Sequence, residues 1–507
     1  MNLAIVHSRA RSGVRAPEVR VEVHLGGGLP SMSIVGLPAA AVREAKDRVR
    51  AALQSSQLEF PARRITVNLA PADLPKDGGR FDLPIALGIL AASGQIPHQA
   101  LADTEFLGEL GLTGELRAVD GALPATLAST LSGRALVLPQ PNGAEAALAA
   151  HARVHTARTL LEVCAALKGQ KSLPPAEATA ALAADGTPDM ADVRGQAHAR
   201  RALEIAAAGA HHLLFVGPPG CGKSMLAARL PSLLPAPSHD ESLETAAIAS
   251  AAGRGDHAAH EASRTWGIRP FRAPHHSASA IALVGGGSVP KPGEVSLAHN
   301  GVLFLDELPE WSRTALEVLR EPLESGTVTV ARAARSVEFP ARFQLVAAMN
   351  PCPCGWAGDA SGRCRCSEES VERYRSRVSG PLMDRIDLHV DVQRLPSSEL
   401  RTTAAPGESS TIVAARVAQA RHVQLERAGK PNARLTQADL RQLCALSAGD
   451  QSLLDAAADR LQLSARSVHR VLRVARTIAD LDASGSIQTR HLTEAIGYRR
   501  VDRGVTR

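Results

Sequence analysis

Leu213-Leu-Phe-Val216 runs directly into Gly217-Pro-Pro-Gly-Cys-Gly-Lys-Ser224, and this stretch decides the fold. The apolar run predicts a buried strand, the glycines predict a tight loop, and the residues from Met225 onward predict a helix. A strand, a glycine-rich loop and a helix in this order form a P-loop, whose backbone N–H groups turn inward and bind phosphate. The residues predicted to bind nucleotide are Gly217, Pro218, Pro219, Gly220, Cys221, Gly222, Lys223 and Ser224.

The lysine and the hydroxyl that follow the last glycine suit ATP and magnesium. We expect the Lys223 ammonium to reach the β- and γ-phosphates of ATP, and the Ser224 hydroxyl to hold Mg²⁺. The alternative is a glycine turn that joins a strand to a helix, and such a turn requires neither side chain.

Two further apolar runs end in polar residues. Val302-Leu-Phe-Leu305 predicts a buried parallel strand, and Asp306 and Glu307 follow it. Since parallel strands of this kind end at site residues, we expect Asp306 to bind Mg²⁺ through water and Glu307 to orient the attacking water. The run from Gln344 to Met349 predicts a third strand, which places Asn350 near the γ-phosphate or that water. A turn former before Pro351 is the other interpretation of Asn350.

Length and composition set the broad class of the protein. The chain has 507 residues, which predicts two to four domains, and 45% hydrophobic residues with 3% aromatics, which predicts cores of Ala, Leu and Val. The net charge of +6 is compatible with nucleic acid but does not establish it. No apolar run approaches 18 residues and the first residues lack the features of a signal peptide. Seven cysteines, four of them clustered, favour a reducing cytoplasm and a metal over disulfides.

The first third of the chain mixes strand and helix patterns. Val19–Leu25 alternates apolar and polar residues, Ile65–Leu69 predicts another strand, and Asp82–Ala92 predicts an apolar helix. Residues 1–168 therefore predict a compact α+β domain. Residues 169–190 are rich in Pro, Ala and small polar residues, which predicts a linker.

Two segments of this domain resemble the proteolytic domain of Lon-type proteases, namely Pro75-Lys-Asp-Gly-Gly-Arg80 and Leu110-Gly-Leu-Thr-Gly-Glu-Leu-Arg117. The resemblance implies a shared fold and a Ser–Lys dyad. The serine position carries Arg80 in this chain, and the lysine position falls near Pro124. Neither residue serves as nucleophile or base, so we expect the peptidase chemistry to be absent.

A long insert separates the P-loop from Asp306. It contains Pro270-Phe-Arg-Ala-Pro-His-His276 and a glycine-rich stretch that predicts mobile loops. His275 and His276 either ligate a metal or have a structural or substrate-loop role. The second interpretation is favoured, because adjacent histidines face opposite ways and usually do not share an ion. Thr327–Phe339 predicts a hairpin with Arg332 and Arg335 near its tip, either a solvated charged turn or a basic fingertip that contacts DNA phosphates.

Four cysteines lie within fifteen residues of one another, after Asn350. They are Cys352, Cys354, Cys364 and Cys366. Four thiolates this close suit a tetrahedral structural Zn²⁺ site, although the C-x-C spacing is tighter than the common C-x-x-C. Free thiols are the alternative.

The end of the chain supplies arginines. Arg385 precedes the alternating strand pattern at Leu388–Val392, and residues from 410 onward predict helices. In the helix predicted from Ser464 to Asp480, with Ser464 as N-cap, Arg466, Arg470 and Arg473 share the face opposite the apolar one. Such a face is either a solvated stripe or the source of an arginine that contacts nucleotide.

The order of strand, P-loop, insert, Asp-Glu strand, hairpin, Asn strand, arginine and helices resembles an AAA+ ATPase. With the segments Pro75–Pro84 and Phe271–His276, the chain is similar to the YifB/ComM family of magnesium-chelatase-like AAA+ ATPases over its whole length. The resemblance implies an α/β AAA+ core at 191–395, a helical lid domain at 396–507 and a homo-hexameric ring. It also implies that Arg385 is an arginine finger and that Arg466 is the second sensor. Arg470 is the alternative candidate for the second sensor.

Proteins of the ComM type are helicases that drive branch migration during natural transformation, so the resemblance implies an ATP-hydrolysing motor on branched or single-stranded DNA. The alternative is an ATP-driven subunit of the chelatase or protein-remodelling type without a DNA substrate. A Lon-like peptidase is disfavoured by Arg80.

Overall fold

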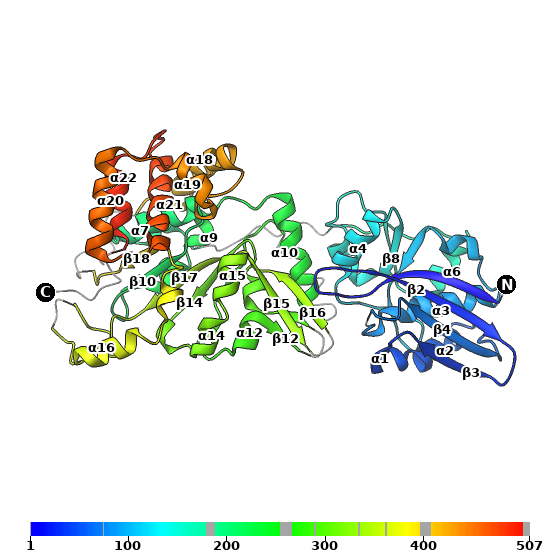
Figure 1. Cartoon of the computed structure of the whole chain (residues 1–507). Coiled ribbons are helices and arrows are strands. Elements are labelled where there is room, and N and C mark those ends of the chain that lie inside the picture. Colours follow the sequence, from blue (N-terminus) through cyan, green and yellow to red (C-terminus); the bar gives the residue numbers. More distant parts are fainter. Residues whose placement is uncertain are drawn as a thin grey trace.

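The computed structural model describes residues 2–74, 76–178, 188–253, 266–287, 290–332, 335–359, 362–395 and 407–499 of the chain. Three parts follow one another along the sequence (Figure 1). An N-terminal part has helices and a mixed sheet, a central part has a parallel sheet, and a C-terminal part is helical. The α/β fold class with a helical C-terminal part is therefore confirmed, and residues 179–187 of the predicted linker lie outside the described residues.

A seven-stranded mixed sheet forms the N-terminal part. The strand predicted at Val19–Leu25 is β2 and the one at Ile65–Leu69 is β4, and the predicted apolar helix is α3 (Asp82–Ala92), every residue of which is buried. The helices around the sheet include α2 (Ala45–Ser55), α4 (Ala122–Leu131), α5 (Gly143–Ala146) and α6 (Leu160–Leu167). The strand order is β3 (Ser31–Val35), β4 (Arg64–Ala70), β2 (Glu18–Gly26), β1 (Leu3–Arg9), β5 (Thr104–Phe106), β8 (Ala135–Pro139) and β9 (Val154–Ala157).

The central sheet has five parallel strands. Their order is β11 (Phe271–Arg272), β14 (Val302–Leu305), β17 (Gln344–Met349), β10 (Leu213–Val216) and β18 (Leu388–Asp391). Strands β10, β14 and β17 consist entirely of buried residues, as expected when helices cover both faces of a parallel sheet. The helix α7 (Ala197–Gly209) precedes β10, and α8 (Lys223–Ala227) follows the P-loop.

The helical segment that follows β14 is divided in two. The run from Arg313 to Leu323 forms α14 (Arg313–Glu317) and α15 (Arg320–Ser325) with a break between them. Pro322 has no N–H to donate to the carbonyl of Val318, so a continuous helix would lose a hydrogen bond at this point. The predicted hairpin follows as β15 (Thr327–Arg332) and β16 (Arg335–Pro340), paired antiparallel.

The C-terminal helices pack beside α7 and the central sheet. They are α18 (Ser410–Ala428), α19 (Gln437–Leu443), α20 (Ala448–Leu461), α21 (Ala465–Leu481) and α22 (Thr489–Gly497). Ser464 caps α21 as predicted, since its hydroxyl accepts a hydrogen bond from the N–H of Ser467. Across the described ranges, no helix is both long and apolar enough to span a bilayer.

Buried polar contacts join the C-terminal helices to the sheet. His211, just before β10, lies 2.8 Å from the Thr477 hydroxyl on α21, and Arg470 donates to Asp387 at 2.6 Å. Burial alone would raise the pKa of Asp387, but the Arg470 guanidinium and His211 hold it well below its usual range. Asp387 is therefore a charged anchor that fixes α21 against the start of β18.

The N-terminal part touches the central part at two places. Leu123 and Leu148 pack against Ala246 and Ala247 of α10 (His239–Ala252), and the Gly121 N–H donates to the carbonyl of Ser250. Second, the turn between β1 and β2 reaches the hairpin (Figure 1), where a Cβ on Gly13 would lie 2.5 Å from a methyl carbon of Val337. The N-terminal part thus supports both α10 and the strand β16 of the hairpin.

Candidate nucleotide-binding site

The parallel register brings three chain segments to one edge of the central sheet. Val216 pairs with Met349, and Leu305 pairs with Ala347, so β10, β14 and β17 end close to one another. The P-loop follows β10, Asp306 follows β14 and Asn350 follows β17. The segments predicted from three separate sequence patterns therefore meet at the carboxyl edge, where parallel sheets form their binding sites.

Glycine is required in the P-loop for two different reasons. At Gly222 the backbone has φ of 96°, in the left-handed region that disfavours other residues. At Gly217 a Cβ would lie 2.2 Å from the carbonyl oxygen of Val392, so the loop can only pass there without a side chain. Gly217 thereby lets the loop turn close to the end of β18.

Lys223 and Ser224 contact the ends of the other two strands. The Lys223 ammonium donates to the carbonyls of Gly217 and Pro218 at 2.7 and 3.0 Å and to the side-chain oxygen of Asn350 at 3.1 Å. The Ser224 hydroxyl donates to an Asp306 carboxylate oxygen at 2.6 Å. A buried ammonium beside backbone N–H groups fits a polyphosphate, and a hydroxyl paired with a carboxylate fits Mg²⁺.

Glu307 lies beside this group and is held by a histidine. Its backbone adopts φ of 51°, a conformation uncommon for glutamate, which turns the chain sharply after Asp306. His276 Nδ1 lies 3.0 Å from a Glu307 carboxylate oxygen, while His275 Nδ1 lies 2.9 Å from the Ser277 hydroxyl. Sequence reasoning singled out the segment that ends at His276 but missed its contact with Glu307.

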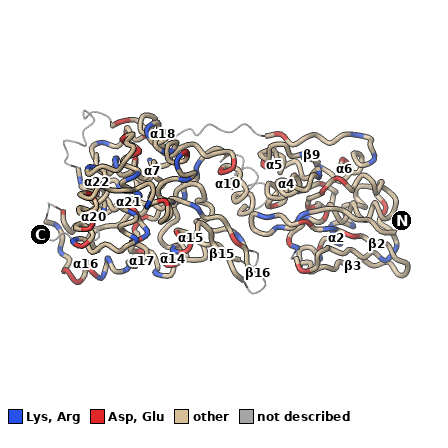
Figure 2. Tube along the Cα trace, turned by 45° about the horizontal axis from the view of Figure 1, so that its top comes forward, with Lys and Arg blue, Asp and Glu red and all other residues tan. Residues whose placement is uncertain are grey.

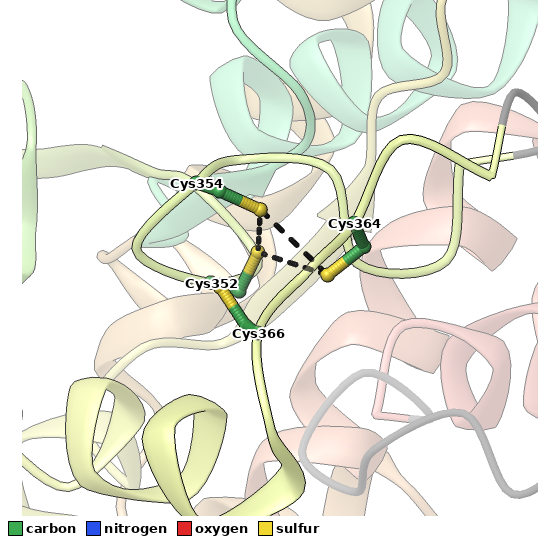
Figure 3. Close-up of side chains that lie close together, drawn as sticks. All are labelled: Cys352, Cys354, Cys364 and Cys366. Carbon is green, nitrogen blue, oxygen red and sulfur yellow. Dashed lines mark hydrogen bonds between the residues drawn. The ribbon is translucent and has the colours of Figure 1, made fainter.

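The four cysteines form one cluster (Figure 3). Their sulfur atoms all lie within 4.8 Å of one another, and Cys352 Sγ is 3.3 Å from Cys354 Sγ and 3.8 Å from Cys364 Sγ. Four thiolates around Zn²⁺ at 2.3 Å would lie about 3.8 Å apart, so the residues fit such an ion. Burial raises the pKa of Cys354, but hydrogen bonds from the N–H groups of Arg365 and Trp356 outweigh it and lower the pKa to about 6.

The cysteine loop packs on the P-loop. A Cβ on Gly355 would lie 2.6 Å from Cδ of Pro219, so the two loops touch without space for a side chain. Cys352 also follows Asn350 by two residues and is fully buried. The cluster therefore supports both the P-loop and the position of Asn350.

Arg385 and Arg466 lie away from these residues. Both approach Glu324 at the end of α15, Arg385 through a hydrogen bond and Arg466 at 3.8 Å. Arg385 precedes β18, so it lies at the amino edge of the sheet, whereas the P-loop lies at the carboxyl edge. No sequence signal marked Glu324, a glutamate at a helix end.

The arginines of α21 do not form a solvated stripe. Arg466 is largely exposed, but Arg470 binds Asp387, and Arg473 donates twice to the Leu435 carbonyl. They are part of the contact between the C-terminal helices and the sheet, which a helical pattern alone cannot distinguish from an exposed face.

The remaining predicted residues are the hairpin arginines and Arg80 of the Lon-like segment. Arg332 pairs with Arg335 at the last described rung of the hairpin, and residues 333–334 lie outside the described part. Arg80 is buried and donates to the carbonyl of Asp120, near the start of the helix that contains Pro124. Burial and the nearby Arg11 lower the pKa of Arg80 to about 10.

Substitutions at Lys223 and Glu307 should separate ATP binding from turnover. We expect Lys223→Ala to weaken ATP binding at least about tenfold, because a charge-assisted contact is lost. We expect Glu307→Gln to bind ATP and to lower turnover by about 10²- to 10⁴-fold, because the amide cannot accept a proton. Equilibrium binding and phosphate release measure the two effects. Glu310→Gln is the control, and wild-type turnover in Glu307→Gln would contradict the role of Glu307.

The cysteine cluster should carry about one zinc ion per chain in protein purified without chelators. Cys352→Ser should release the ion and lower the temperature of unfolding, because the loop that supports the P-loop loses its cross-link. Elemental analysis and thermal unfolding measure these changes. Cys164→Ser, in the N-terminal part, should keep the zinc, and a wild-type protein free of metal would contradict the site.

Comparison with known proteins covers all three parts of the chain. Family models match residues 189–400 as magnesium chelatase subunit ChlI, residues 21–142 as subunit ChlI of Mg-chelatase, and residues 407–499 as the ChlI C-terminal part. A magnesium-chelatase subunit ChlI of Porphyra purpurea is 30% identical over 120 residues, 24% of this chain and 28% of that protein.

Several relatives match almost the full length of the chain. Competence protein ComM of Haemophilus influenzae is 52% identical over 510 residues, 99% of this chain and 98% of the relative. The uncharacterized protein YifB of Escherichia coli is 49% identical over 504 residues, again 99% and 98% of the two chains. Similarity of this extent, over almost the full length of both chains, means that the chain belongs to the YifB/ComM family of magnesium-chelatase-like proteins.

Proposed function

We propose that this protein is an ATP-hydrolysing ring motor that acts on DNA, in the manner of a ComM-type branch-migration helicase. One observation carries the ATPase part of the proposal. Ser224 pairs with Asp306, and Lys223 with Asn350, on the same edge of the sheet where Glu307 lies. This set combines a phosphate loop, a magnesium-binding pair and a candidate base, which together hydrolyse a nucleoside triphosphate.

Each residue has one task in this scheme. The P-loop N–H groups and Lys223 bind the phosphates, and Ser224 and Asp306 hold Mg²⁺, which neutralises charge on the β- and γ-phosphates. Glu307 orients the attacking water, and Asn350 holds that water or the γ-phosphate. His276 lies 3.0 Å from the Glu307 carboxylate, so a movement of the insert that contains His276 would release that carboxylate for the water.

The position of Arg385 supports the proposal of a ring. Charge that develops on the γ-phosphate needs a cation opposite the Lys223 side. Arg385 and Arg466 lie at the amino edge, roughly 10 Å of strand away from their own P-loop, so they serve a neighbouring copy. In the single chain both arginines form ion pairs with Glu324. In the ring, contacts with the phosphates of a neighbour's nucleotide would replace these ion pairs.

The DNA substrate is supported by a relative and by the hairpin. The Haemophilus relative is named a competence protein, and competence is the ability to take up DNA. The hairpin projects from the central part and has arginines at both sides of its tip, as a phosphate-contacting element would. The net charge does not locate the DNA, because Figure 2 shows lysine, arginine and acidic residues spread over all parts of the chain.

A chelatase-type or remodelling subunit is the second candidate, because the family models are named for magnesium chelatase. The two functions differ in one simple property. A DNA motor hydrolyses ATP faster in the presence of DNA, whereas a chelatase-type subunit responds to protein partners.

DNA should therefore stimulate ATP hydrolysis. We expect branched DNA to raise the rate of phosphate release several-fold, and we expect the double substitution Arg332→Ala and Arg335→Ala to reduce this stimulation, because phosphate contacts are lost. Arg373→Ala, an exposed arginine on the helix Glu368–Arg375, is the control. A rate that is the same with and without DNA would favour the second candidate.

Mixed rings should test the trans arginine. Arg385→Ala chains are expected to be inactive, because removal of an arginine of this kind lowers the rate by about 10³- to 10⁵-fold. Lys223→Ala chains are expected to be inactive because they bind ATP poorly. Mixing them should restore part of the activity, since some interfaces then join an intact P-loop to an intact Arg385. Phosphate release and ring formation are measured together. Mixed rings without activity, or a monomer that works at the full rate, would refute the trans role.

A further inference from the structure

A large cleft lies at the amino edge of the central sheet, on the side away from the P-loop. Its volume is about 940 Å³, within the range of small-molecule sites. The residues just before β10, β14, β17 and β18 form its floor, including His212, Gly301, Gln344 and Asp387. Segments of the C-terminal helices from Arg421 to Arg473 form the opposite wall.

The charge of this cleft is strongly unbalanced. Seven arginines and one lysine line it, against the three carboxylates Glu241, Glu324 and Asp387. Asp387 is already bound to Arg470, and Glu324 to Arg385 and Arg466. Glu241 pairs with Arg269, and Glu244 and Asp439, which lie outside the lining, pair with Arg342 and Lys430. The lining cations that pair with no carboxylate of the described residues are Arg421, Arg434 and Arg473.

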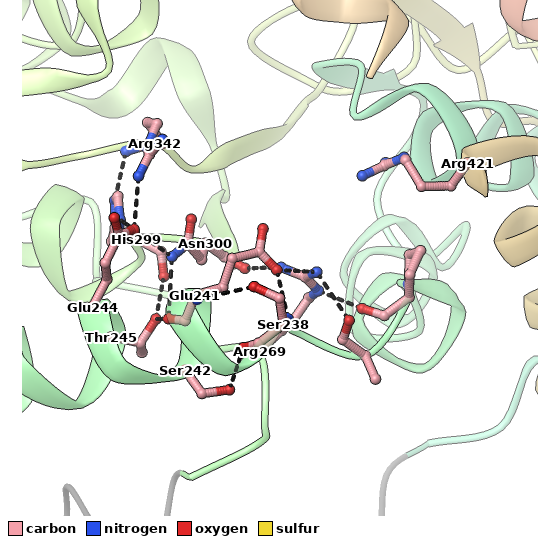
Figure 4. Close-up of polar contacts among 12 residues, drawn as sticks. Ser238, Glu241, Ser242, Glu244, Thr245, Arg269, His299, Asn300, Arg342 and Arg421 are labelled. Carbon is pink, nitrogen blue, oxygen red and sulfur yellow. Dashed lines mark hydrogen bonds and ion pairs between the residues drawn. The ribbon is translucent and has the colours of Figure 1, made fainter. Parts of the chain in front are cut away.

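A hydrogen-bond network builds the wall on the side of the sheet (Figure 4). The Arg269 guanidinium donates to Glu241 at 2.9 Å and to the carbonyls of Pro235 and Asn300 at 2.5 and 2.7 Å. Arg342 donates to Glu244 at 2.7 Å and remains about 43% exposed. The network fixes both arginines in place before any ligand arrives, which reduces the entropy lost on binding.

Arg421 and Arg434 approach from the opposite wall. Arg421 uses two of its N–H groups on the carbonyls of Ala208 and Ala207, at the end of α7, and its guanidinium faces the network (Figure 4). Burial, Arg269 and Arg434 lower the pKa of Arg421 to about 10. Within the described residues, no side chain or carbonyl accepts a hydrogen bond from the Arg434 guanidinium, and burial and Arg342 lower its pKa.

We propose that this cleft binds a free small ligand that carries two or more phosphate groups and has the size of a nucleotide. Arg342 and Arg434 supply the contacts that the protein itself leaves unused, and Arg269 and Arg421 add charge behind them. Guanidinium groups bind phosphate in a planar, two-point geometry. They bind carboxylates in the same geometry, but a polyphosphate carries more negative charge than a carboxylate ligand of similar size, so the excess of arginines favours a polyphosphate.

A continuous nucleic-acid strand fits the cleft less well. This step rests on the proposed function, because the edge that carries Arg385 would face a neighbouring copy in the ring. A ligand enclosed at such an interface is small, and it would influence how the two copies meet. The cleft lies at the edge of the sheet opposite the chain's own P-loop. Arg466 also lines the cleft but is not among the proposed ligand contacts, because it is assigned to a neighbour's nucleotide.

Calorimetric titration of the full-length Lys223→Ala protein with inorganic tripolyphosphate tests the site, because this background weakens binding at the P-loop and leaves that loop identical in all the variants compared. We expect saturable binding that weakens as salt is added. Arg434→Gln and Arg342→Gln, each in this background, should lower the affinity about tenfold. Arg441→Gln, an exposed arginine of α19 outside the cleft, should bind as before. Unfolding curves establish that Arg434→Gln, which removes no hydrogen bond to a described residue, leaves the fold intact.

Three results would overturn the proposal. They are a Lys223→Ala protein that does not bind tripolyphosphate, binding that is the same in Arg434→Gln and Arg342→Gln, and tighter Arg434-dependent binding of a single-stranded oligonucleotide than of tripolyphosphate. The last result would assign the cleft to a strand. Since none of these measurements depends on ATP turnover or on DNA stimulation, they are independent of the proposed motor function.

Discussion

The parallel pairing of β10 with β17 and of β17 with β14 is the constraint on which the rest of the structure depends. Parallel strands in register send all their carboxyl ends to one edge and all their amino ends to the other. The first edge collects the P-loop, Asp306 and Asn350, and the second collects Arg385 and the basic cleft. A strand of four residues thus separates two sets of charged groups that a single chain cannot bring together.

The sequence predicted the carboxyl edge because its signals are local. A glycine loop between an apolar run and a helix, or a polar residue directly after a buried strand, needs no knowledge of distant contacts. The hairpin, the helix Asp82–Ala92 and the cap at Ser464 were predictable for the same reason. The cysteine cluster was also visible from spacing, although its support of Pro219 was not.

Contacts between distant segments were beyond such reasoning. His276 contacts Glu307 only because the insert folds back beside β14. Glu324 forms ion pairs with Arg385 and Arg466, which come from two other segments of the chain. The arginines of α21 show the limit most clearly. A helical pattern places them on one face, but whether that face meets water or Asp387 depends on the packing of the C-terminal helices against the sheet.

The close approach of Gly13 to Val337 has a consequence for how the protein can be dissected. Val337 and Phe339 belong to the core beneath the hairpin, and Val14 packs against that core. A chain shortened to the central and C-terminal parts would uncover these side chains together with Ala246 and Ala247 of α10. Such a fragment would present a fresh apolar surface to water and tend to aggregate. The N-terminal part is in this sense a built-in cover for the central and C-terminal parts, whatever else it does.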